Sequence, residues 1–104
     1  MSTQELIDRF MEKLNSFDSS QDLADFLTEE RVKGYKADSD SCVISNWLED
    51  KTGFDVSTED EIRFYSFGQF GEVVSVRDIS QVVKNFIEEF DEGKHPQLDW
   101  ETYF

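Results

Sequence analysis

The sequence predicts an α+β domain: three N-terminal helices, an antiparallel sheet of about three strands, one C-terminal helix and a short aromatic tail. Apolar residues recur at helical spacing in residues 3–53 and again in 79–90. Between these regions, apolar and polar residues alternate as they do in strands. A length of 104 residues and an aromatic content of 14% suit a single domain, 1–104, with one core.

Capping residues place the helix boundaries. Ser2 and Glu5 form a capping-box pattern, so the first helix is predicted to begin near Thr3. For the other helices, serine or aspartate is the expected N-cap and glycine the expected end: Ser19 or Ser20 with Gly34, Asp40 or Ser41 with Gly53, and Asp78 with Gly93.

The predicted sheet has strands near 54–56, at 62–67 and at 72–76, with a hairpin connection at 68–71. In the middle strand, Ile62 and Phe64 point to one face of the sheet and Tyr65 to the other. We expect helices or the aromatic tail to cover that second face. If they do not, three aromatic residues form an exposed patch that would contact a partner: Tyr65, Phe67 and Phe70.

The chain is strongly acidic, with 24 Asp and Glu against 10 Lys and Arg and a net charge of -14. Such a charge repels nucleic acids and anionic membranes, so neither is an expected partner. Basic protein surfaces are the expected partners, including those of proteins that bind nucleic acid. A single cysteine and the lack of an apolar signal or spanning segment indicate a cytoplasmic protein.

No motif indicates a cofactor or a metal. Asp38, Asp40 and Glu49 match three positions of a calcium loop, but Val43 stands where that loop needs glycine, so we interpret these residues as helix-capping. Cys42 is expected to be a buried thiol near the start of the third helix, and nothing brings His95 to it. We therefore do not expect an enzyme, and a hydrolase using Cys42 is the weakest alternative.

Two acidic clusters are the candidate partner-binding residues. The first lies at the C-terminal end of the last helix, where the helix dipole disfavours anions by about 0.3–1 kcal/mol each: Glu88, Glu89, Asp91 and Glu92. Neutralising this cluster is expected to weaken partner binding and to raise stability slightly. The second precedes the middle strand, with Arg63 and Arg77 as candidate ion-pair partners: Glu59, Asp60 and Glu61.

These features favour a small, inhibitor-like acidic domain that engages a basic protein surface. In its narrowest form it would mimic a nucleic acid, since a duplex of about 33 Å carries on the order of 19 charges. Size and charge, though no motif, resemble small acidic inhibitors and immunity proteins of phage or bacterial conflict systems. The alternative is a housekeeping interaction module or oligomer subunit that binds through the aromatic patch, with acidity serving solubility. The oligomeric state stays open.

Overall fold

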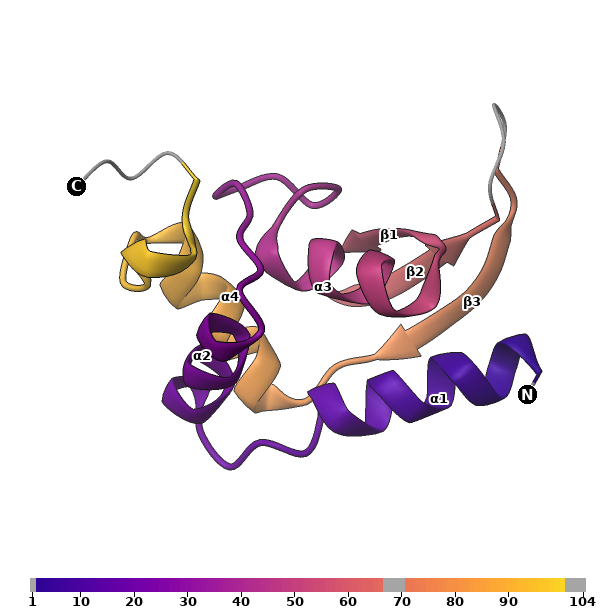
Figure 1. Ribbon diagram of the computed structural model, residues 1–104, viewed down its shortest axis with the longest axis horizontal. Helices are drawn as coiled ribbons and strands as arrows, with labels where there is room; N and C mark the ends of the chain where they lie inside the picture. The colour runs from indigo at the N-terminus through magenta and orange to yellow at the C-terminus, as the bar shows by residue number, and fades with distance from the viewer. Residues whose placement is uncertain (1, 67–70, 101–104) are drawn as a thin grey trace.

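A computed structural model describes residues 2–66 and 71–100 of the chain and confirms the predicted α+β class (Figure 1). Within these residues four helices accompany one three-stranded antiparallel sheet, in the order β1-β2-β3. The elements are α1 (Thr3–Leu14), α2 (Ser20–Glu29), α3 (Val43–Thr52), β1 (Asp55–Thr58), β2 (Glu61–Tyr65), β3 (Val73–Asp78), α4 (Gln81–Asp91) and the 3-10 turn η1 (Pro96–Leu98).

Side-chain caps start the four α-helices, and two of them differ from the prediction. Ser2 and Ser19 cap α1 and α2 as expected. Asp40 and Ser41 belong to the preceding turn, in which the Asp38 carboxylate accepts their N–H groups, so α3 begins after them and Cys42 is its cap. Ser80 caps α4 in place of Asp78, which is the last residue of β3.

Gly34 does not end α2, contrary to our expectation. That helix stops at Glu29, and Arg31 takes the left-handed conformation that follows it, with φ of 60°. Gly34 instead lies buried where two segments meet: a Cβ there would be 2.2 Å from the Val43 nitrogen. Its N–H donates to Leu98 O at 2.9 Å, so the close approach also joins the C-terminal segment to the start of α3.

One face of the sheet carries the core and the other is partly exposed. Ile62 and Phe64 are fully buried, and α3 packs against this sheet (Figure 1). On the other face Arg63 and its cross-strand partner Val76 are exposed, whereas Ser57 is buried and Tyr65 half-buried. The expected cover by the tail stays a prediction, because residues 101–104 lie outside the described residues. The described C-terminal segment packs instead on α2.

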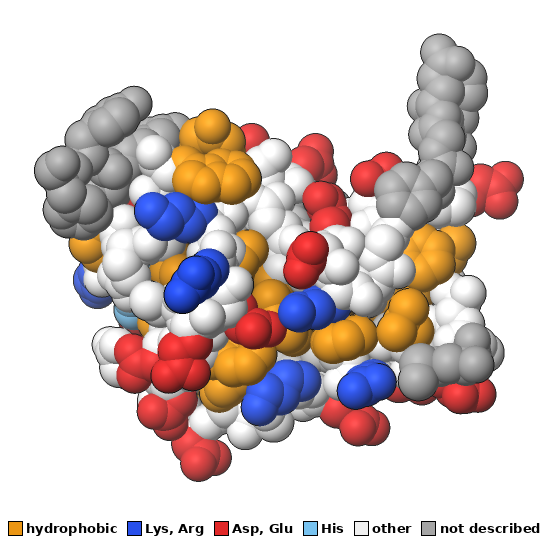
Figure 2. Space-filling view, in the orientation of Figure 1, with side chains coloured by type: hydrophobic (Ala, Val, Ile, Leu, Met, Phe, Trp, Pro, Cys, Tyr) orange, Lys and Arg blue, Asp and Glu red, His pale blue; other side chains and the backbone are white. Residues whose placement is uncertain are grey.

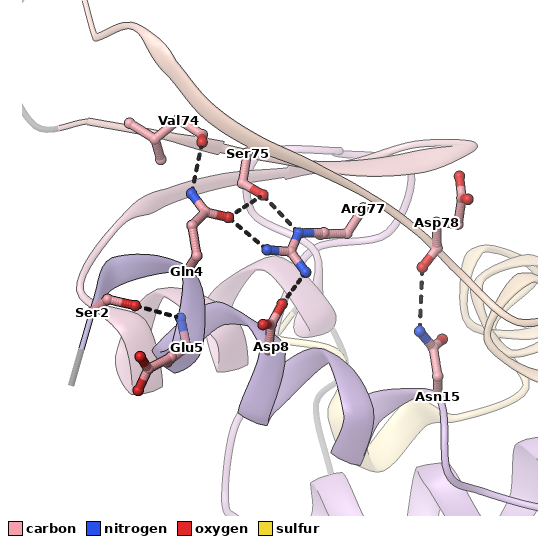
Figure 3. Close-up of polar contacts among 9 residues, drawn as sticks. All are labelled: Ser2, Gln4, Glu5, Asp8, Asn15, Val74, Ser75, Arg77 and Asp78. Carbon is pink, nitrogen blue, oxygen red and sulfur yellow. Dashed lines mark hydrogen bonds and ion pairs between the residues drawn. The ribbon is translucent and has the colours of Figure 1, made fainter.

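A polar network fastens α1 to β3 (Figure 3). The Arg77 guanidinium pairs with Asp8 and donates to Gln4 Oε1 at 2.6 Å and to Ser75 Oγ at 2.7 Å. Gln4 in turn donates to Val74 O at 3.1 Å. Arg77 therefore pairs with Asp8 and not, as predicted, with the acidic cluster of Glu59, Asp60 and Glu61.

Replacing Arg77 by methionine is expected to lower the free energy of unfolding by about 1–2 kcal/mol, because it removes several charge-assisted hydrogen bonds at once. Urea denaturation measures this loss. The matched control is Arg63→Met, which breaks the more exposed pair with Glu61 at 2.9 Å and should leave stability nearly unchanged, because water screens an exposed pair. Equal losses in the two variants would contradict the structural role of Arg77.

Candidate functional site

The two acidic clusters, separated in the sequence, meet on one surface. The turn between β1 and β2 brings Glu59 and Asp60 beside α4, where they line a hollow with Ile87 and Glu88. The same turn residues and Ile87 line an adjoining hollow with Asp38 and Asp91. We call these carboxylates the acidic surface: Asp38, Glu59, Asp60, Glu88 and Asp91.

The acidic surface is concave and has an apolar centre. Its two hollows have volumes of about 320 and 140 Å³ and share Ile87, which is half-buried. The five carboxylates around it are all exposed, and Lys84 is the one cation among the described lining residues. Exposed carboxylates around an apolar centre suit the aliphatic stem and charged head of a lysine or arginine side chain.

Three of the residues predicted to bind a partner protein contact groups of this chain instead or as well: Glu61, Asp91 and Glu92. Glu61 pairs with Arg63 at 2.9 Å, which confirms one of the two predicted ion pairs. Glu92 pairs with Lys94, also at 2.9 Å. Asp91 lines the acidic surface but also accepts the Ala37 N–H at 2.8 Å. The C-terminal acids of α4 are therefore better compensated than the sequence suggests.

Glu89 is the most engaged of these carboxylates. One oxygen lies 2.9 Å from Nε2 of His95, and the other accepts the Ser20 hydroxyl at 2.9 Å. The hydrogen bond with His95, and then that from Ser20, lowers the pKa of Glu89 below its ordinary value. The carboxylate joins α4 to the start of α2 and to the segment before η1, so we assign Glu89 to the fold rather than to the surface.

The residues considered for calcium or for nucleophilic chemistry also have structural partners. Glu49 accepts the Val56 N–H at 3.1 Å, and burial raises the pKa of its carboxyl. Cys42 is buried, as predicted, with its sulfur 3.4 Å from the Ser45 nitrogen, while His95 stacks on Phe86. Within residues 2–66 and 71–100, no three His, Cys, Asp or Glu side chains are grouped to hold a metal ion.

The predicted aromatic patch is only partly visible. Tyr65 is half-buried at the end of β2. Phe67 and Phe70, with the connection between them, lie outside the described residues. The exposed apolar residues on β3 are instead Val73 and Val76.

Sequence reasoning missed Asp38, Lys84 and Ile87 as parts of the acidic surface. Lys84 and Ile87 carry a detectable signal, since they lie four residues before Glu88 and Asp91, respectively, on the same helix. Asp38 carries none, because only the folded loop before α3 brings it to α4.

Comparisons with protein-family models, with curated proteins and with solved structures find no match to this chain. In the described residues no helix has the length and apolarity needed to cross a membrane.

Proposed function

We propose that this chain is a small acidic protein-binding domain whose acidic surface engages a basic surface of a partner protein. The observation that carries the proposal is the convergence of Glu59, Asp60, Glu88 and Asp91 around Ile87 from two distant parts of the sequence. Exposed like charges gathered in one place repel each other, and a basic partner would relieve that repulsion.

The proposed role is binding, inhibitor-like, and not catalytic. Its narrow form is a nucleic-acid mimic that occupies the nucleic-acid site of its partner, as in a phage or bacterial conflict system. The net charge of -14 supports this form because it excludes direct binding to nucleic acid while matching its sign. The single buried thiol is compatible with the cytoplasmic location that we propose.

The test is affinity capture from the native host with variants of matched charge. One variant neutralises the acidic surface by Glu59→Gln, Asp60→Asn and Glu88→Gln, and keeps Asp91 because it accepts a backbone N–H. The control neutralises three exposed acids elsewhere, by Asp18→Asn, Glu29→Gln and Glu72→Gln. Both variants have a net charge of -11, three fewer negative charges than the parent.

A basic partner is expected to be retained by the parent and the control, to elute as salt rises toward about 0.5 M, and to bind the surface variant about 100-fold more weakly. Competition by duplex or single-stranded nucleic acid then tests the mimic. Retention of the same proteins by all three chains at about 0.5 M salt would overturn the proposal, since screened charges could not supply that binding.

A further inference from the structure

The unpaired cations of this acidic chain are concentrated in one groove. Of the ten Lys and Arg, five make ion pairs in the described part of the chain: Lys36, Lys51, Arg63, Arg77 and Lys94. Lys84 lies at the acidic surface. The remaining four, Arg9, Lys13, Arg31 and Lys33, all line two adjoining hollows between α1, α2 and α3. We call this the basic groove.

The groove has an aromatic floor. Trp47 makes edge-to-face contacts with Phe10 and Phe26, with ring centroids 5.9 and 5.5 Å apart. Arg9 lies over the Phe10 ring and Lys13 over the Phe26 ring, at 5.6 and 5.0 Å from the centroids. Figure 2 shows this face of the molecule, with Lys and Arg side chains interleaved among hydrophobic ones. Here the cations contact rings rather than carboxylates.

In the described part of the groove, three carboxylates are outnumbered by five cations. Glu30 accepts the Trp47 indole N–H at 3.1 Å and lies 3.4 Å from the Lys51 ammonium, and these contacts lower its pKa. Asp50 also pairs with Lys51, at 3.9 Å. Glu12 is the remaining acid among the described lining residues. The groove thus keeps a positive charge although more than two-thirds of the chain's charged residues are acidic.

Arg31 adopts a backbone conformation that residues other than glycine disfavour. Its φ of 60° is left-handed, a conformation that costs a residue with a Cβ about 1 kcal/mol and that glycine adopts freely. The side chain is exposed and makes no ion pair with the described residues. A cation kept in a strained position without an internal partner suggests an external one.

We infer that the basic groove binds an acidic segment of a partner protein that carries an aromatic side chain between carboxylates. The larger hollow, of about 520 Å³, has the aromatic floor, and the unpaired cations of α1 stand at its rim. The adjoining hollow of about 320 Å³ continues past Trp47 to Lys33 and Trp100. A short peptide satisfies these cations with few charges, whereas a nucleic acid would add a dense line of them to a chain of -14.

Display selection from a library of random peptides, on the immobilised protein at low salt, tests this inference. Enriched peptides are expected to combine acidic and aromatic residues. The best of them, synthesised, should change the fluorescence of the two tryptophans, Trp47 and Trp100, which both line the groove. Arg9→Glu with Lys13→Glu should weaken its binding about 100-fold, as reversal of two contacting charges predicts.

Arg31→Gly keeps the test independent of misfolding, because it relieves the left-handed strain. It should weaken peptide binding by about threefold to tenfold while raising the melting temperature. The acidic-surface variant should bind the peptide at least as well as the parent, so failure here is distinguishable from failure of the proposed function.

Three results would overturn the inference. The first is enrichment of basic or uncharged peptides only. The second is undiminished binding to the Arg9→Glu, Lys13→Glu variant. The third is self-association of the parent, seen by sedimentation and abolished in that same variant, which would assign the groove to a second copy.

Discussion

Replacing Gly34 by alanine is expected to lower the free energy of unfolding by about 3 kcal/mol or more. The added Cβ would lie 2.2 Å from the Val43 nitrogen and 2.4 Å from the Cys42 carbonyl carbon. Both are backbone atoms at the start of α3, so no side chain can rotate away to make room. The variant must separate this backbone from Gly34 or lose the hydrogen bonds that Gly34 makes with the C-terminal segment.

Gly53 provides the control for this prediction. Its φ is 78°, but a Cβ there would meet nothing within 4 Å, so its need for glycine is conformational. Asparagine tolerates the left-handed region, and Gly53→Asn should therefore cost under about 1 kcal/mol. Gly34→Asn should be at least as damaging as Gly34→Ala. Thermal unfolding of the parent and the three variants tests this ranking of stabilities. A Gly34→Ala variant as stable as Gly53→Asn would show that the close approach at Gly34 is wrong.

Replacing Glu89 by glutamine is expected to lower the free energy of unfolding by about 1–2 kcal/mol at neutral pH. Glutamine has one acceptor oxygen and no charge, so at most one of the two donors keeps its acceptor and neither hydrogen bond stays charge-assisted. This prediction reverses the sequence-based expectation for Glu89, because its helix position is unfavourable but its contacts more than offset the dipole. Glu88→Gln, one residue earlier and exposed, should leave stability unchanged or slightly raised.

The effect of Glu89→Gln should also depend on pH. The hydrogen bonds from His95 and Ser20 lower the pKa of Glu89 in the folded state below its ordinary value of 4.5. Its stabilising contribution is therefore complete above that value and is lost as pH falls through the lowered folded pKa. Urea denaturation of parent and variant across this range should show their difference vanish in acid. A constant difference would mean that the charge of Glu89 does not matter.

Periodicity predicted the elements well because local burial patterns determine them. The stripe of Ile7, Met11 and Leu14 is buried as the spacing indicates, and Ile62 and Phe64 are buried on one side of β2. The boundaries were less accurate because the turn before α3 extends further than the capping pattern indicates. The Asp38 carboxylate accepts the N–H groups of Asp40 and Ser41 in that turn, so Cys42 becomes the cap and α3 begins at Val43.

The candidate site could be predicted only in part. The sequence identifies Glu59, Asp60, Glu88 and Asp91 as excess charge, but their meeting depends on the tertiary packing of the β1–β2 turn against α4. The sequence also places Glu89 among the partner-binding residues, because it does not reveal the contacts of Glu89 with Ser20 and His95, which lie 69 and 6 residues away. The basic groove escapes sequence reasoning for the same reason, since its cations come from α1 and from the segment after α2.

Backbone groups on both edge strands of the sheet are hydrogen-bonded to other parts of the chain. On β1 the N–H of Val56 donates to Glu49, and that of Thr58 to the Ser39 carbonyl. On β3 the carbonyls of Val74 and Asp78 accept from the side chains of Gln4 and Asn15. Strand addition and edge-to-edge aggregation both need such groups unoccupied. At these positions the sheet cannot be extended by a foreign strand.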